Sequence, residues 1–300
     1  MKKTIGLIGL GKMGSMIAEN LLDHRYKVIA HNRSPEPVKK IAKKGAIPAF
    51  TIPEFVTKFP DQKIILLSIT AGPAVDTVLQ SLKPYLRKGD IIIDSGNNFY
   101  KDSVKRYNEM KKIGVSFIDM GTSGGLSGAR NGASLMIGGD KSTFKKIEPL
   151  FKDLAVKNGY GYMGPSGAGN YVKTVHNGIE YALLEAYAEG FGVLDKSKYD
   201  YDYKTVARVW SNGSVIRSWI TELAEEAFTK YKNKLKTFKG VIGGGQTGMW
   251  TVKMAKEVKA DVHTLEHAIA KRKKSQKQQS FATKFVAAIR FGFGGHTEPM

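Results

Sequence analysis

The chain has 300 residues, of which 42% are hydrophobic, which suits one large domain or two of ordinary size with a substantial core. No apolar run approaches the roughly 20 residues of a membrane span, and the strand-like N-terminus is unlike a signal peptide. With no cysteine, disulfides, a thiol nucleophile and a thiolate metal site are excluded. We therefore expect a cytoplasmic protein without a membrane partner.

The net charge of +20 points to anionic partners. Basic surfaces bind nucleic-acid backbones without sequence preference, and a positive cleft also concentrates small anionic substrates. Much of the excess lies in solvated runs such as residues 271–277, which contain no interleaved aromatic side chain. We expect mostly generic surface charge, with a minority serving a cleft, and no specific nucleic-acid partner.

The N-terminal residues 4–10 form an apolar run that is typical of a buried parallel strand, and a helical pattern follows from Met16. Between them, closely spaced glycines allow a tight turn, a close backbone approach to a pyrophosphate and close helix packing. The helix N-terminus then directs unpaired amides toward the phosphates. The predicted coenzyme contacts are Gly9, Leu10, Gly11, Lys12, Met13 and Gly14.

A second strand, residues 26–31, is followed by Asn32, Arg33 and Ser34. An NAD-binding protein usually carries a carboxylate here, which accepts hydrogen bonds from the adenosine ribose. None is present, and Arg33 can instead stack on adenine or pair with a 2′-phosphate. The alternative is a turn with an incidental arginine. We predict that these three residues bind the coenzyme and favour NADP over NAD, although they also permit dual use.

Further predicted strands alternate with helices, which indicates a doubly wound parallel sheet of Rossmann type, assigned to residues 1–163. The strands are residues 63–69, 90–94, 116–120 and 134–137, and the helices are residues 37–44, 74–82 and 100–113. Residues 128–136 are read as a turn leading into an edge strand, with no chemistry assigned to Arg130.

Three loops should gather at the carboxyl ends of these strands, where such sheets bind ligands. The first, residues 69–72, contributes Ala71 toward the coenzyme. The second, residues 94–98, contains Asn97 and is fit to hold a ribose, a nicotinamide amide or a substrate hydroxyl. The third offers Ser123, Gly124 and Gly125, whose amides and hydroxyl suit a carboxylate. Either of the last two could also be an ordinary Gly/Ser loop.

After residue 164 the pattern becomes helical, which predicts an all-helical domain over residues 164–300 for substrate binding and dimerisation. Its helices are predicted at residues 170–192, 203–210, 215–232, 250–260, 262–270 and 282–290. On the first of them, Lys173, His176, Asn177, Glu180 and Tyr181 fall at offsets 0, 3, 4, 7 and 8, the spacing of one helical face. This polar stripe either lines a cleft or is a solvated face with a Lys/Glu pair.

These motifs, in this order and spacing, resemble the decarboxylating 6-phosphogluconate dehydrogenases of the β-hydroxyacid dehydrogenase superfamily. The motifs are Gly9–Gly14, residues 32–34, residues 94–98, residues 123–125, residues 173–181 and Ile216-Arg217-Ser218. The similarity runs nearly end to end, and His-Asn-Gly-Ile-Glu-Tyr after Lys173 is its most specific piece. The chain resembles the short form of that enzyme.

The resemblance implies oxidative decarboxylation of 6-phospho-D-gluconate to D-ribulose 5-phosphate and CO2 in the pentose phosphate pathway, with reduction of NADP or NAD. Lys173 would remove the proton of the carbon-3 hydroxyl, and Glu180 would protonate carbon 1 of the enediol. Lys173 would need burial or nearby cations to lower its pKa from ~10.4. Substrate oxygens would be bound by Asn97, Ser123, Gly124, Gly125, His176 and Asn177.

The substrate phosphate is assigned by the resemblance to Tyr181, Arg217, Thr247 and Arg290. Arg290 and His296 match a tail that in the long enzyme reaches into a neighbouring subunit, which implies a dimer or a tetramer. The alternative for Arg290 is a cation at a helix C-terminus. No metal is required.

Two departures from the family pattern stand out. Glycine occupies residues 243–245, where the family usually carries a phosphate-binding lysine, so either some phosphate affinity is lost or Lys253 or another cation compensates. Leu126-Ser127 replaces an acidic pair of the family.

Two other functions remain open at this point. A 3-hydroxyisobutyrate-type dehydrogenase shares the glycine loop but lacks the Glu-Tyr pair and the Arg290/His296 tail, so both features favour the phosphorylated sugar acid. A basic, cofactor-binding regulatory protein without turnover would bind nucleic acid in a salt-sensitive way, and the spacing of the basic residues does not support it.

Overall fold

The chain forms two compact units, one ending at Thr174 and the other beginning at Val175. The computed structural model describes residues 4–298, and the division between the units lies inside the long helix α8 (Ala168–Asp195). The sheet of the first unit ends with β8 (Ala155–Gly164). The domain boundary expected between residues 163 and 164 stays a prediction.

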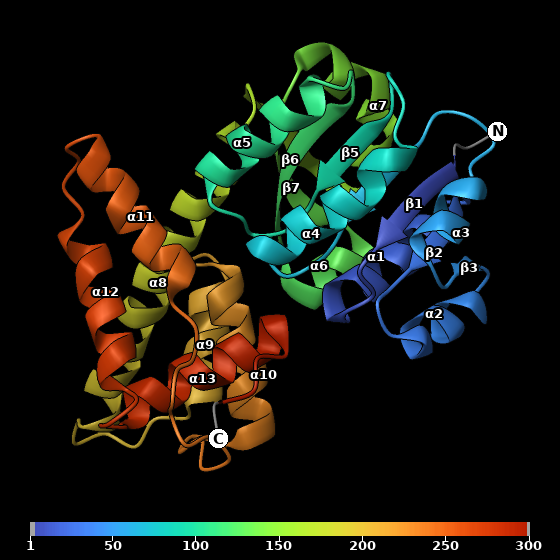
Figure 1. Ribbon diagram of the computed structural model, residues 1–300. Helices are drawn as coiled ribbons and strands as arrows, with labels where there is room; N and C mark the ends of the chain where they lie inside the picture. The colour runs from blue at the N-terminus through green and yellow to red at the C-terminus, as the bar shows by residue number, and fades with distance from the viewer. Residues whose placement is uncertain (1–3, 299–300) are drawn as a thin grey trace. The chain divides into compact units, whose positions relative to one another are not determined.

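The first unit is built on an eight-stranded sheet with the strand order β3-β2-β1-β4-β5-β6-β7-β8 (Figure 1). The remaining strands are β1 (Thr4–Ile8), β2 (Lys27–His31), β3 (Ile47–Ala49), β4 (Ile64–Leu67), β5 (Ile91–Asp94), β6 (Ser116–Ser123) and β7 (Ala133–Gly138). All neighbours run parallel except the antiparallel pair β6 and β7. The predicted Rossmann-type sheet followed by a helical region is confirmed.

Helices cover both faces of this sheet because alternate residues of each central strand point to opposite sides. Ile64 and Leu66 pack with α1, α2 and α7, whereas Ile65 and Leu67 pack with α3, α4 and α5. The helices are α1 (Lys12–Asp23), α2 (Pro35–Ala42), α3 (Ile52–Thr57), α4 (Pro73–Leu82), α5 (Tyr100–Lys111), α6 (Gly125–Asn131) and α7 (Lys141–Leu154), with a 3-10 turn at Lys83–Tyr85.

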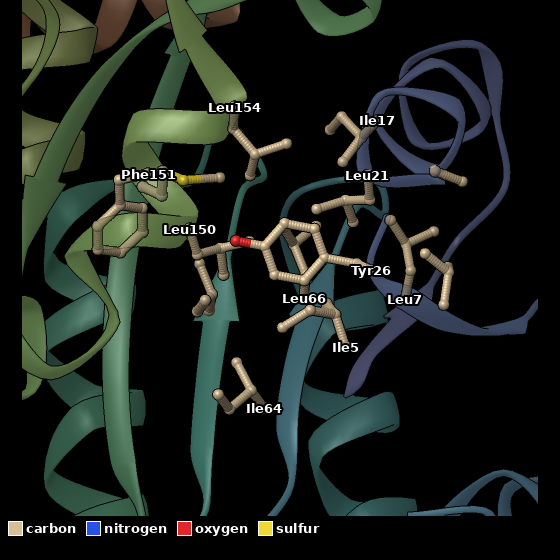
Figure 2. Packing of buried hydrophobic residues seen from close by; sticks show 14 of the residues in the cluster. Ile5, Leu7, Ile17, Leu21, Tyr26, Ile64, Leu66, Leu150, Phe151 and Leu154 are labelled. Atoms are coloured by element: carbon tan, nitrogen blue, oxygen red, sulfur yellow. The ribbon is translucent and has the colours of Figure 1, made fainter. Parts of the chain in front are cut away.

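The core of the first face joins segments that are far apart in sequence (Figure 2). Side chains from β1, α1, β4 and α7 converge around Tyr26, whose hydroxyl donates to Asp153 Oδ2 at 2.7 Å. Burial and this contact with a carboxylate raise the pKa of Tyr26, so the phenol stays a donor. The bond ties the start of β2 to α7.

Two details differ from the expectation. Residues 125–131 form the short helix α6, and β7 is an interior strand because β8 pairs with it on its other side. The sequence Ala-Val-Lys-Asn-Gly-Tyr-Gly-Tyr-Met-Gly of β8 is mostly solvent-accessible and lacks a run of aliphatic residues, so it carries no strong strand pattern.

The second unit is helical. Besides the end of α8 it contains α9 (Tyr203–Ser211), α10 (Trp219–Tyr231), α11 (Gln246–Glu257), α12 (His263–Lys274) and α13 (Phe281–Gly294). Its core is aromatic: the ring of Phe191 lies 5.0 Å from those of Trp210, Phe228 and Phe285. Among residues 4–298, no helix combines the length and apolar character that crossing a membrane would require.

Candidate functional site

The turn between β1 and α1 has the geometry of a phosphate-binding loop. Gly9 has φ +98°, and a Cβ there would lie 2.3 Å from the Ser68 carbonyl oxygen. At Gly14 a Cβ would lie 1.9 Å from the Gly9 carbonyl oxygen, so glycine is required at both positions. A Cβ at Gly11, by contrast, would meet no atom of the protein within 4 Å. Gly11 is the N-cap of α1 and provides no side-chain cap, so the first-turn amides suit a pyrophosphate.

The loop after β2 supports this turn through Asn32. Its Oδ1 accepts a hydrogen bond from Leu10 N at 3.0 Å, and its Nδ2 donates to the carbonyl and the hydroxyl of Ser34, both at 3.1 Å. The side chain of Asn32 therefore joins the turn after β1 to the loop after β2. Arg33 is exposed beside it and is the cation of this loop that faces solvent.

The loops after β4 and β5 are joined by a buried polar network. Asn98 donates to both oxygens of Asp94, at 3.2 and 3.0 Å, and its own Oδ1 accepts from Gly72 N at 2.9 Å. Arg106 donates to the Gly72 carbonyl at 3.0 Å and lies 3.5 Å from Asp94. Burial raises the pKa of Asp94 to about 7, against the lowering effects of the Gly96 amide and Arg106.

The residues of these two loops differ in burial, and the difference separates structural residues from accessible ones. Asp94 and Asn98 are almost completely buried and hold the loops together, whereas Asn97 is exposed at the carboxyl edge. Ala71 is partly exposed and precedes Gly72. Asn97 and Ala71 are thus among the residues of these loops that a ligand can reach.

The N-terminus of α8 is fixed on the end of β6 by Asp119. The buried carboxylate accepts from Gly167 N at 2.7 Å and from Asn170 N at 2.9 Å. Burial raises the pKa of Asp119, and the backbone amides oppose that rise. The helix needs no cap from its own sequence because the strand supplies one.

Glycine makes this contact close enough to bury Lys173. A Cβ at Gly121 would lie 2.4 Å from Lys173 Cβ, and a Cβ at Gly169 would lie 2.5 Å from the Met136 carbonyl oxygen. Lys173 is 6% exposed. Two residues after Gly121, Ser123 ends β6, and Gly124 (φ +115°) is the N-cap of α6. Ser123, Gly124 and Gly125 therefore form a partly buried turn at the same end of the strand.

Further along α8, in the second unit, the polar stripe continues. His176 Nδ1 lies 3.1 Å from Asn177 Oδ1, and Asn177 is 7% exposed. Gly178 packs against α11, where a Cβ would lie 2.7 Å from Thr251 Cγ2. Glu180 is partly exposed.

Tyr181 is the centre of a cationic cluster. Its hydroxyl lies 3.1 Å from Thr247 Oγ1, and one ring face lies against Gly248, where a Cβ would be 2.5 Å from the ring carbons. The guanidinium carbon of Arg272 lies 3.6 Å from the ring centroid. This stacking buries Arg272 to 5% exposure.

The positive charges of Arg272, which is buried, and Arg290, which is partly buried, repel each other. Burial, followed by the Arg272 charge, lowers the pKa of Arg290 to about 10, while Tyr181 and Glu180 act in the opposite direction. The Nη1 atom of Arg272 is buried and has no hydrogen-bond partner among residues 4–298. Two such guanidiniums, two hydroxyls and the N-terminus of α11, capped only by Gly245, suit a bound dianion.

Two predicted residues are not brought into this cluster. Arg217 is exposed in the turn before α10, where Ser218 caps the helix and Tyr187 holds the Ile216 carbonyl, so this motif has a structural use. His296 packs on the ring of Phe293, with centroids 5.9 Å apart. Arg290 lies beside Tyr181 of its own chain, and a role toward a neighbouring subunit stays a prediction.

Arg272 itself was missed by the sequence interpretation, which counted it within a solvated basic run. Its neighbours Lys273 and Lys274 are indeed exposed. The apolar residues Ala268 and Ile269, four and three residues before Arg272 on α12, were the available signal, because this spacing places all three on one helical face.

Within the part of the chain that the structure describes, no group of three or more His, Asp or Glu side chains is arranged to hold a metal ion.

The glycine turn, the Rossmann sheet and the helical unit define an NAD(P)-binding oxidoreductase. Comparison with known proteins gives the family. The profile of the NAD binding domain of 6-phosphogluconate dehydrogenase matches residues 4–164, and that of the 6-phosphogluconate dehydrogenase C-terminal domain matches residues 169–290. The chain belongs to the 6-phosphogluconate dehydrogenase family.

Relatives of the same length and longer ones both match. YqeC of Bacillus subtilis, named as a candidate 6-phosphogluconate dehydrogenase, is 43% identical over 97% of this chain and 98% of its own. The NAD(+)-dependent, decarboxylating 6-phosphogluconate dehydrogenase of Haloferax volcanii is 41% identical over 97% of each. The solved Plasmodium falciparum 6-phosphogluconate dehydrogenase is 31% identical with a TM-score of 0.83, over 91% of this chain but 62% of its own.

The cationic cluster of Tyr181, Thr247, Arg272 and Arg290 yields a first prediction. Arg272→Ala should weaken the binding of inorganic phosphate by about 10- to 100-fold, because it removes charged hydrogen bonds in a partly dehydrated site. Lys273→Ala removes the same charge from an exposed neighbour and should change the Kd by less than about twofold. Calorimetric titration of both variants makes the comparison, and equal losses would show that only the net charge matters.

Proposed function

We propose that the chain catalyses the oxidative decarboxylation of 6-phosphogluconate to ribulose 5-phosphate and CO2 with reduction of a nicotinamide dinucleotide. The observation that carries the proposal is the cluster of Tyr181, Thr247, Arg272 and Arg290, because an uncharged substrate tail would leave the buried Nη1 atom of Arg272 without an acceptor. The decarboxylating relative from Haloferax volcanii supports the same reaction.

Lys173 is the proposed general base. Its burial keeps bulk water away from the amine, and Asp119 and Gly121 restrict where its side chain begins. In its neutral form it takes the proton of the carbon-3 hydroxyl. A bound nicotinamide dinucleotide would supply the hydride acceptor for the same carbon. Lys173, now protonated, hydrogen-bonds the new carbonyl and so stabilises the negative charge that develops on it as CO2 leaves.

Glu180 is the proposed acid that protonates carbon 1 of the resulting enediol. It follows Lys173 by seven residues on α8, which is about two turns or roughly 10 Å along the axis. Long side chains at that separation can reach the two ends of a short carbon chain. His176 and Asn177 are proposed to bind substrate oxygens from the intervening turn, and Asn97, Ser123, Gly124 and Gly125 to bind the sugar acid from the strand ends.

A spectrophotometric assay of coenzyme reduction tests this proposal. Wild-type protein should reduce one coenzyme per CO2 released from 6-phosphogluconate. Lys173→Ala should lower kcat by about 10²- to 10⁴-fold because the base is lost, with coenzyme Kd nearly unchanged. Val172→Ala, an exposed position on the same turn, serves as the control. Activity only on small unphosphorylated 3-hydroxy acids would reject the proposed substrate, and a mild loss in Lys173→Ala would reject the base.

For the coenzyme we propose NADP in preference to NAD. The support is the exposed Arg33 and the absence of a carboxylate among residues 32–34, where an NAD-binding protein would hold the ribose hydroxyls. The Haloferax relative, however, is named as NAD(+)-dependent. The preference therefore depends on Arg33.

Arg33→Ala should raise KM for NADP by about tenfold or more, because a charge-assisted contact with the 2′-phosphate is lost. KM for NAD, which has no 2′-phosphate, should stay within about twofold. Lys27→Ala removes a positive charge from the opposite end of β2 and should affect neither. If both coenzymes lose affinity equally, Arg33 does not recognise the phosphate.

We further propose that the chain self-associates through α8. Ile179, Leu183 and Val193 are 50%, 42% and 70% exposed, and they fall within one face of the helix. Leu183→Glu should then convert the wild-type oligomer to monomers in sedimentation equilibrium, whereas a monomeric wild type would contradict the proposal. Cytoplasmic location and the choice between dimer and tetramer stay predictions.

A further inference from the structure

The loop that leads into α11 is rich in glycine and lies against the cationic cluster. Residues 240–245 contain four glycines, of which Gly240, Gly244 and Gly245 have φ angles of +93°, +75° and +123°. A Cβ at Gly244 would lie 3.5 Å from Arg290 Nη2, and a Cβ at Gly245 would lie 3.6 Å from Arg272 Cδ. Such a segment loses much conformational freedom on ordering, so other groups must hold it.

The side chain of Glu298 holds the start of this loop. Its carboxylate accepts hydrogen bonds from three successive amides: Lys239 N at 2.7 Å, Gly240 N, and Val241 N at 3.0 Å. Consecutive backbone amides that converge in this way form an anion-binding nest. Gly240 is required in it, because a Cβ there would lie 2.5 Å from Thr283 Oγ1.

The middle of the loop is tied to the last turn of α12. Ile242 N donates to Ser275 Oγ at 3.0 Å, and Gln276 Nε2 donates to the Ile242 carbonyl at 2.7 Å. Ser275 Oγ in turn donates to the Arg272 carbonyl at 2.6 Å. The loop is therefore fixed at one end by the C-terminal tail and in the middle by the turn that carries Arg272.

We propose that Glu298 is a positioning residue for the cationic cluster. By closing the amide nest it orders residues 239–245, and this order sets the N-terminus of α11, with Thr247, beside Arg272 and Arg290. The tail carboxylate thereby compensates for the flexibility that three successive glycines bring to a phosphate-binding loop. The inference rests on the proposed function for the identity of the phosphorylated substrate. The ordering of residues 239–245 by the Glu298 carboxylate, which we call the latch, does not depend on that function.

Hydrogen exchange tests the latch directly. In Glu298→Ala the amides of Lys239, Gly240 and Val241 should exchange about tenfold faster or more, because each loses a charge-assisted hydrogen bond. Thr297→Ala, at the exposed neighbouring residue, is the matched control and should leave them unchanged. Unaltered exchange in Glu298→Ala would overturn the latch.

Ligand binding and kinetics test the positioning role. Glu298→Ala should raise the Kd for inorganic phosphate and KM for 6-phosphogluconate by about five- to tenfold, while kcat and coenzyme KM stay within about twofold. Glu298→Gln keeps one acceptor without the charge and should fall between Glu298→Ala and wild type. A parallel fall in kcat and rise in both KM values would indicate general damage and overturn the role. If the wild type does not turn over 6-phosphogluconate, the proposed function fails, and exchange and phosphate affinity still decide the latch.

Discussion

The hydrogen bonds from the first amides of α8 to the buried carboxylate of Asp119 are the constraint on which the rest of the site depends. A charged carboxylate would be costly at this depth, and burial indeed raises its pKa. The helix N-terminus offsets this cost with amides and a favourable dipole. In return, the strand fixes the direction in which α8 starts and the depth at which Lys173 lies. Gly121 and Gly169 make the contact possible because neither position has room for a Cβ.

The second unit poses a different electrostatic problem, because Arg272 is buried and a second guanidinium, that of Arg290, lies close to it. Arg272 lies on the Tyr181 ring, and its charge adds to the effect of burial in lowering the pKa of Arg290. Stacking on an aromatic face partly replaces hydration for Arg272, but its Nη1 atom still lacks an acceptor among the described residues. An arrangement of this kind is unfavourable by itself and becomes favourable with an anion, which is a property of a binding site rather than of a structural core.

The sequence was sufficient where a role follows from local spacing. The turn of Gly9, Gly11 and Gly14 and the Rossmann sheet could be predicted because a glycine-rich turn between an aliphatic strand and a helix is a specific local pattern. It was insufficient where a role depends on packing between distant segments. Tyr181 on another helix covers Arg272, and β8 pairs with the edge that β7 offers, and neither contact can be read from local spacing. The role of Arg217 stays a prediction, and its neighbours Ile216 and Ser218 serve Tyr187 and the cap of α10.

Glycine at residues 243–245, read from sequence alone as the loss of a phosphate-binding lysine, has a second consequence in the structure. A lysine brings one charge on a flexible stem, whereas glycine at residue 245 adopts φ +123° and leaves the first turn of α11 without a side-chain cap. The unpaired amides of that turn are themselves attractive to an anion. The positive charge that the loop lacks is then supplied by Arg272 and Arg290 from α12 and α13, which approach it at Gly245 and Gly244. The phosphate binding proposed for this unit is thus expected to depend on how well the backbone of the loop is held, and less on any one side chain within it.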